Sequence, residues 1–141
     1  GLHRRFLLHV PRAAGVSPDR PLPLVLLLPG NRNDPDSFLK FPDIVSLSEQ
    51  EPFIILELIA QHLQFNVELN SLPDPQRPDD VAYTSSALRK VESALCIDRR
   101  RVFCTGMSRG IRFCMRLASE LSDTIAAVGA VSGLRYPQPN N

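Results

Sequence analysis

The sequence has 141 residues, of which 43% are hydrophobic and 22% are charged, proportions typical of a globular chain with a single core. A net charge of +1 excludes a strongly electrostatic partner, so we expect neither nucleic-acid nor membrane-surface binding. No apolar stretch reaches the roughly 18 residues that a transmembrane helix needs. We therefore expect one domain over residues 1–141, with no membrane partner.

The first half of the chain contains three candidate strands. Residues 5–10 predict a first strand, and residues 24–28 form a continuous apolar run bounded by prolines and Gly30. Such a run is typical of a strand buried on both faces of a parallel sheet. Residues 37–49 predict a weak helix interrupted at Pro42, and residues 53–59 predict the third strand.

The second half alternates helices and strands. A helix is expected to start at Asp79 or Asp80, because both carboxylates suit a helix N-terminus as caps. Residues 101–105 predict a strand, preceded by a basic run at residues 99–101 that we expect in a solvated turn. A helix follows, with a narrow polar stripe on an otherwise apolar surface, and residues 126–132 predict a last strand. The stripe consists of Arg109, Arg112, Arg116 and Glu120.

This order of elements indicates the fold class. Strands that alternate with helices form an α/β, doubly wound and mostly parallel sheet. Metal chemistry is not indicated, because the three cysteines form no CxxC pair and the three histidines are scattered. We therefore expect no metal site.

The strongest chemical signal is the pentapeptide Gly106-Met107-Ser108-Arg109-Gly110. A G-x-S-x-G sequence between a strand and a helix predicts a nucleophile elbow, in which only small residues fit two positions before and after the serine. The helix N-terminus would favour negative charge, and the N–H of Arg109 would face a developing oxyanion. The alternative is a glycine-bounded turn with Ser108 as a helix cap; the flanking strand and helix favour the elbow.

Residues 79–133 resemble the poly(3-hydroxybutyrate) depolymerase and feruloyl esterase family of α/β-hydrolases. The resemblance is carried by DDV at the start of a helix, CIDRRRV leading into a strand, GMSRG, RLASELSD and AAVGAVSG. RRFLLHVP and RPLPLVLLLPG extend it toward the N-terminus. The resemblance implies the N-terminal portion of an α/β-hydrolase domain, incomplete at its C-terminal end.

The resemblance also implies a serine carboxylic ester hydrolase without metal or organic cofactor, with Ser108 as the acyl-forming nucleophile. The oxyanion would accept hydrogen bonds from the N–H groups of Arg109 and Asn31; an ordinary turn at Gly30-Asn31 is the alternative. The substrate would be an ester, either of an aromatic acid on a polysaccharide or of a polyester. Secretion is expected from the resemblance to the family. No signal peptide is visible in the sequence.

The sequence departs from the family at several positions. Pro29 stands where the family has histidine, and Arg109 stands where it has asparagine. Ser119 replaces a cysteine, so Cys96 is expected to lack its partner. The other two cysteines, Cys104 and Cys114, are expected as unpaired thiols in the core.

The largest departure concerns the catalytic triad, which in this fold runs Ser, Asp or Glu, then His in chain order. None of the 33 residues after Ser108 is histidine, and the one downstream aspartate, Asp123, is expected as a polar residue at a helix end. His62 precedes Ser108 and is expected on a surface loop. Two hypotheses remain: an esterase whose acid and base lie outside this sequence, and a truncated or degenerate non-catalytic domain. On either, this chain alone should hydrolyse esters poorly.

Overall fold

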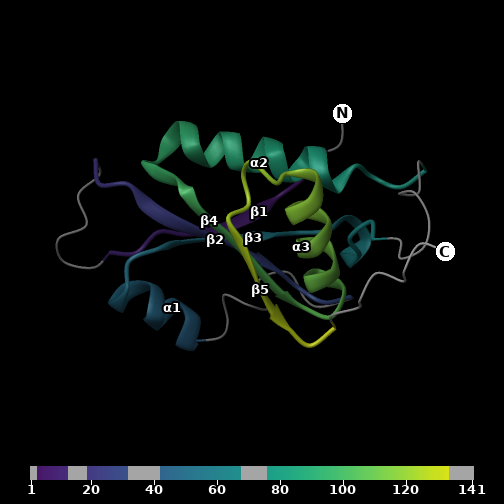
Figure 1. Ribbon diagram of the computed structural model, residues 1–141, viewed down its shortest axis with the longest axis horizontal. Helices are drawn as coiled ribbons and strands as arrows, with labels where there is room; N and C mark the ends of the chain where they lie inside the picture. Colours follow the sequence, from purple (N-terminus) through teal and green to yellow (C-terminus); the bar gives the residue numbers. More distant parts are fainter. Residues whose placement is uncertain (1–2, 13–18, 32–41, 68–75, 134–141) are drawn as a thin grey trace.

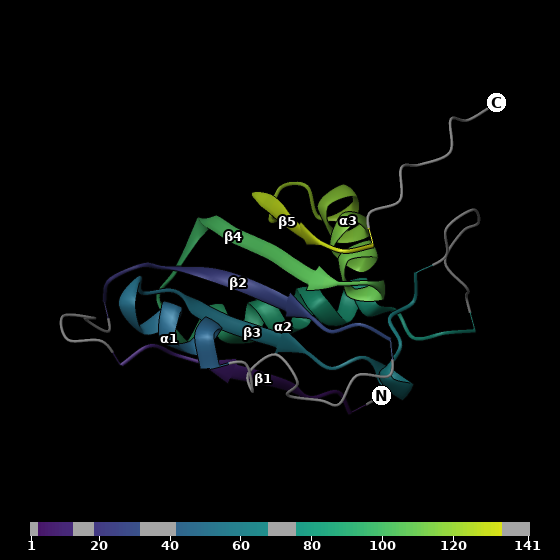
Figure 2. The ribbon, with the colours of Figure 1, turned by 90° about the horizontal axis from the view of Figure 1, so that it is seen from below.

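The computed structural model describes residues 3–12, 19–31, 42–67 and 76–133. Within these ranges the chain forms a five-stranded sheet in the order β1-β3-β2-β4-β5. Neighbouring strands are parallel except for β1, which runs antiparallel to β3. Figure 2 shows the strands side by side in this order. The strands are β1 (Phe6–His9), β2 (Leu22–Leu28), β3 (Ile54–Leu58), β4 (Ile97–Met107) and β5 (Ala127–Val131).

Helices cover both faces of the sheet, as the predicted doubly wound fold requires. The described helices are α1 (Pro42–Gln50), α2 (Asp80–Ala94) and α3 (Arg109–Glu120), with a short 3-10 turn, η1 (Gln61–Leu63), after β3. In Figure 1, α2 runs above the sheet and α1 lies below it. The α/β class and the predicted order of strands and helices are therefore confirmed.

The start of β4 differs from the sequence expectation. The basic run at residues 99–101 lies inside β4, which begins at Ile97, so its assignment to a turn is wrong; its side chains are exposed, as expected. The strand extends early because Leu22 pairs with Ile97 across the β2–β4 ladder. Helix α1 is described from Pro42, a first-turn position that proline tolerates well, and the predicted interruption at Pro42 stays a prediction. Residues 37–41 of the predicted helix lie outside the described residues.

The core lies between the sheet and the pair α2 and α3. Alternate residues of β2 and β3 point to this side, as the two-residue repeat of a strand demands. They meet the apolar faces of both helices in one cluster. Its fully buried members include Leu24, Leu26, Leu28, Ile54, Leu56, Leu58, Val91, Phe113 and Leu117.

Strand β5 is unusually open for a strand of a parallel sheet. Four of its five residues are exposed, and Val131 keeps 59% of its surface accessible. Among the described residues β5 pairs only with β4, so its outer edge has no neighbouring strand. Parallel strands are normally covered on both faces, and within the described part of the chain β5 is not.

Candidate active site

Ser108 lies in the turn between β4 and α3, at the carboxyl end of a strand inside the sheet. Strand β4 ends at Met107 and helix α3 begins at Arg109, which is the position that the glycine-serine motif predicts. The backbone of Ser108 has φ 54° and ψ −117°, a sparsely populated conformation for a residue with a side chain. Such strain persists only where surrounding structure enforces it, and it is concentrated at functional sites. The Ser108 residue is exposed.

Gly106 and Gly110 allow the end of β2 to lie directly against this turn. A Cβ at Gly110 would overlap the Leu28 carbonyl oxygen and lie 2.6 Å from the Leu28 carbonyl carbon and 2.7 Å from the Pro29 oxygen. A Cβ at Gly106 would overlap the same Leu28 oxygen. Since these neighbours are backbone atoms, they have no rotamer by which to move aside. The spacing of the motif is therefore a packing requirement of the turn.

The residues after β5 press on Ser108 from the opposite side. The Ser108 N–H donates a hydrogen bond of 2.8 Å to the Ser132 carbonyl oxygen. Gly133 adopts φ +111°, and a Cβ there would lie 2.9 Å from the Ser108 Cα and 3.0 Å from the Ser108 carbonyl oxygen. The strained serine is thus held between the ends of two strands, β2 and β5.

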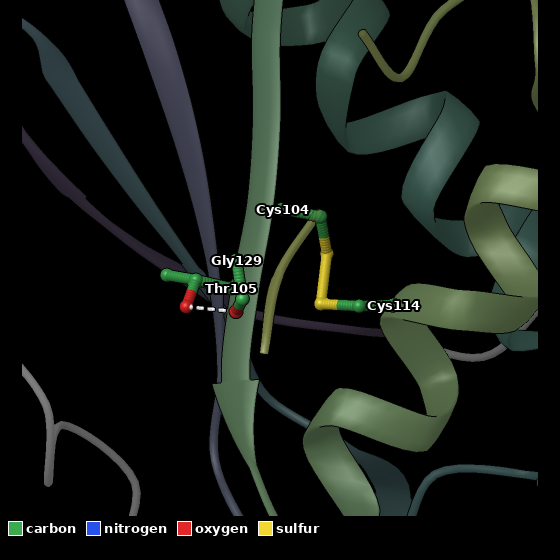
Figure 3. Close-up of a disulfide and its surroundings, with 4 residues drawn as sticks. All are labelled: Cys104, Thr105, Cys114 and Gly129. Carbon is green, nitrogen blue, oxygen red and sulfur yellow. Dashed lines mark hydrogen bonds between the residues drawn. A yellow bond between two sulfur atoms is a disulfide. The ribbon is translucent and has the colours of Figure 1, made fainter. Parts of the chain in front are cut away.

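A disulfide joins Cys104 on β4 to Cys114 on α3, and the expectation that both are unpaired thiols is wrong. Their Cα atoms lie 5.7 Å apart, and both residues are fully buried in the core (Figure 3). The bridge connects the strand before Ser108 with the helix after it. No cysteine-spacing motif signals this pair; the available signal was that Cys104 points inward from its strand toward the helix that carries Cys114. Cys96 is free and exposed, so its prediction as unpaired is confirmed.

The polar stripe of α3 binds the segment that follows η1. Arg109 donates from Nε to the Phe65 carbonyl oxygen at 2.7 Å and from Nη2 to the Val67 oxygen at 3.4 Å. Arg116 donates from Nη1 to the Asn66 oxygen between them, at 2.7 Å. Two arginines of one helix therefore hold three consecutive carbonyl groups, and they fix this segment beside the turn that carries Ser108.

Asp80 holds the same segment from α2. Its carboxylate accepts a 2.6 Å hydrogen bond from the Asn66 N–H and a 2.7 Å hydrogen bond from Arg4. Asp79 is the N-cap of α2 and accepts from the Ala82 N–H at 2.9 Å, so the interpretation of Asp80 as a cap is wrong; Asp80 is the first residue of the helix and is 1% exposed. The Arg4 guanidinium also lies 3.9 Å from the centre of the Tyr83 ring, and burial raises the pKa of that phenol.

In the described ranges, no hydrogen bond joins Ser108 to the other residues considered for catalysis. Asn31 is exposed just after the buried Pro29-Gly30, and residues 32–41 beyond it lie outside the described part. His62 is exposed in η1 with φ 52°, and Asp123 is exposed in the turn after α3. Among the described residues, no histidine or carboxylate side chain hydrogen-bonds to Ser108. The roles of Ser108, Arg109 and Asn31 therefore stay predictions.

The described ranges contain no cluster of three or more histidine, cysteine, aspartate or glutamate residues able to hold a metal ion. Nor does any helix in these ranges have the length and apolar character to cross a bilayer.

Comparison with solved structures identifies the fold as that of the α/β-hydrolases. Serine hydrolase F of Staphylococcus aureus, which binds fluorophosphonates, superposes with a TM-score of 0.74 at 17% identity, covering 93% of this chain and 52% of the other. A CE1 ferulic acid esterase from Anaeromyces mucronatus superposes with a TM-score of 0.64 at 20% identity. The match covers 90% of this chain and 52% of the esterase. An S-formylglutathione hydrolase from Agrobacterium tumefaciens superposes with a TM-score of 0.68 at 15% identity. The match covers 89% of this chain and 50% of the hydrolase.

These likenesses are structural. No protein-family model matches the sequence, and no curated protein sequence matches it. At identities of 15 to 20% the comparison shows the shared fold, with this chain spanning about half the length of each of the three proteins. A serine at a strand-to-helix turn of an α/β-hydrolase fold is a candidate nucleophile by its place in that architecture.

Proposed function

We propose that this chain carries the nucleophile of a serine carboxylic ester hydrolase. The observation that supports this most directly is the backbone of Ser108, which is held at φ 54° in the exposed turn between β4 and α3. A cap serine at an ordinary helix start has extended backbone angles. Ser108 does not, and its side chain makes no capping hydrogen bond.

In the proposed reaction, the Ser108 Oγ attacks the carbonyl carbon of an ester while a base takes its proton. The N–H of Arg109, and that of Asn31, would stabilise the resulting oxyanion. The alcohol leaves with that proton, and water then hydrolyses the Ser108 ester to restore the hydroxyl. The acid and the histidine base would come from a part of the fold that lies outside this sequence, beside the open edge of β5.

The substrate class we propose is an ester of an aromatic acid on a polysaccharide, or a hydroxyalkanoate polyester. Esterase structures among those with the same fold support the general class, one of them a ferulic acid esterase. We propose secretion for the same protein. The Cys104–Cys114 disulfide supports this, because structural disulfides form and persist mainly in oxidising compartments.

The test is hydrolysis of p-nitrophenyl acetate by the purified 141-residue chain, beside its Ser108→Ala variant. Without a histidine base we expect turnover several orders of magnitude below that of a complete triad. A longer protein that includes a downstream Asp and His should restore rapid turnover, and Ser108→Ala in that protein should abolish it. Rapid turnover that survives Ser108→Ala would refute the proposed nucleophile.

A second candidate is a degenerate, non-catalytic hydrolase-like domain. In this candidate, Ser108 occupies the turn between β4 and α3 without a histidine to take its proton. The two proposals separate on whether the natural gene encodes an acid and a histidine beyond Asn141. If it encodes neither, the domain has the fold of an esterase without its base.

A further inference from the structure

We infer that the Cys104–Cys114 disulfide is a positioning element for Ser108, which makes the geometry of the candidate nucleophile dependent on thiol oxidation. The positioning role rests on the proposed function, since it concerns the residue proposed to attack the ester. The disulfide itself is a feature of the fold. Its consequences can be measured without any esterase activity.

The position of the bridge in the chain carries the argument. Cys104 precedes Ser108 by four residues on β4, and Cys114 follows it by six residues on α3. The disulfide thus closes a short covalent loop with the strained serine inside it. Within this loop the strand and the helix diverge from the turn, and the bridge fixes the distance between them beyond the turn (Figure 3).

The other constraints on Ser108 are noncovalent, and each acts from one side. Leu28 contacts Gly106 and Gly110 from β2, and Ser132 accepts the Ser108 N–H from beyond β5. Next to Cys104, the Thr105 hydroxyl donates to the Gly129 carbonyl oxygen at 2.6 Å, which ties β4 to β5 (Figure 3). Apart from the backbone through Ser108 itself, the disulfide is the covalent link between β4 and α3. Its loss should therefore loosen the turn more than it loosens the centre of the sheet.

Oxidation and reduction of this pair follow ordinary thiol exchange. Two thiols lose two protons and two electrons to a small disulfide such as oxidised glutathione, which becomes two glutathione thiols. Dithiothreitol reverses the step and leaves as its own cyclic disulfide. Because both cysteines are 0% exposed, exchange requires a local opening of the β4–α3 contact, whereas exposed Cys96 reacts directly.

The first measurement is peptide mapping of the native chain after alkylation with iodoacetamide and digestion without reductant. We expect a cross-linked peptide pair containing Cys104 and Cys114, with the alkyl group only on Cys96. Alkylation of Cys104 and Cys114 in the native, air-oxidised protein would overturn the inference. This result is independent of whether Ser108 is catalytic.

The second measurement is amide hydrogen exchange of three samples: the oxidised chain, the chain reduced by dithiothreitol, and Cys104→Ala/Cys114→Ala. Cys96→Ala, which removes the free thiol, is the matched control. We expect exchange at Ser108 and Arg109 to accelerate at least tenfold more than exchange at Leu26 and Leu56 in the reduced chain and in the double variant, with no change in Cys96→Ala. A uniform acceleration over the sheet and the turn would show general stabilisation only, and would overturn the positioning role.

If the double variant does not fold, the reduced wild-type chain still decides between these outcomes. Failure of the proposed function would appear differently, as an inactive longer protein whose turn nevertheless shows the redox-dependent exchange. The two proposals therefore fail on separate observations.

Discussion

Substitution of Gly110 by alanine tests whether the spacing of the glycine motif is dictated by packing. Gly110 is in the first turn of α3, where the new methyl group would overlap the Leu28 carbonyl and approach the Pro29 oxygen to 2.7 Å. Backbone atoms of Leu28 and Pro29 lie around this methyl group on the side of β2. Either the end of β2 or the start of α3 must then move away, and Ser108 lies between Gly106 and Gly110.

The magnitude follows from two opposing contributions. Forcing an extra methyl group into a packed region costs about 1–3 kcal/mol, and rigid backbone neighbours place this site near the upper value. Replacing glycine by alanine in a helix returns about 1 kcal/mol. The net loss of unfolding free energy is thus about 2 kcal/mol. With an unfolding entropy of about 2.1 cal/mol/K per residue over 141 residues, the Tm should fall by about 7 °C.

Gly129→Ala is the matched control, because it adds the same methyl group to β5. There the nearest atom would be the Thr105 Oγ1 at 3.5 Å, an ordinary van der Waals distance. Alanine is favoured over glycine in a strand by about 0.5–1 kcal/mol, so stability should stay constant or rise slightly. Urea unfolding and thermal melts followed by circular dichroism measure both variants. Equal stability of Gly110→Ala and wild type would refute the packing argument.

Three further predictions concern the contacts around the turn. Asp80→Ala should lower the unfolding free energy by about 3–5 kcal/mol in urea titration, because it leaves Arg4 without its buried partner, whereas Asp79→Ala removes only a helix cap and should cost about 1 kcal/mol. Arg109→Lys keeps the charge but loses the guanidinium fork, so amide exchange over residues 65–67 should accelerate about tenfold; the exposed Arg89→Lys should leave it unchanged. Gly133→Ala should cost about 1–3 kcal/mol because of its positive φ and its approach to Ser108; unchanged stability would mean that the turn after β5 yields freely.

The fold could be predicted from the sequence because its main signals are local. The apolar run that became β2 and the small-residue run that became β5 are both short and bounded by turn or polar residues. The motif at residues 106–110 identified a strand, a turn and a helix in one step. The polar stripe of α3 was also visible as a repeat of three and four residues.

What the sequence did not reveal depends on contacts between distant residues. Asp80 is of a residue type that often caps helices. Only the fold brings Arg4 and the Asn66 N–H to its carboxylate. The arginines of the stripe were recognised as polar, but their acceptors are backbone carbonyls, which no sequence pattern records. The disulfide between Cys104 and Cys114 was not predicted, because no cysteine-spacing motif marks this pair and the resemblance implied a different pairing, of Cys96 with the position of Ser119. Burial of Cys104 and Cys114 was correctly expected, and two buried thiols on facing elements are also the arrangement that a disulfide requires.

The contacts around the turn between β4 and α3 come from elements far apart in the chain and converge on Ser108. Ser108 is held by the end of β2 through Gly106 and Gly110, by the turn after β5 through Ser132, and by the disulfide between β4 and α3. A strained backbone costs free energy that ordinary turns avoid, so three independent supports indicate a conformation that the fold maintains against relaxation. A domain with no use for Ser108 would gain stability by losing this strain. The geometry therefore supports the proposed role of Ser108 over an ordinary turn serine.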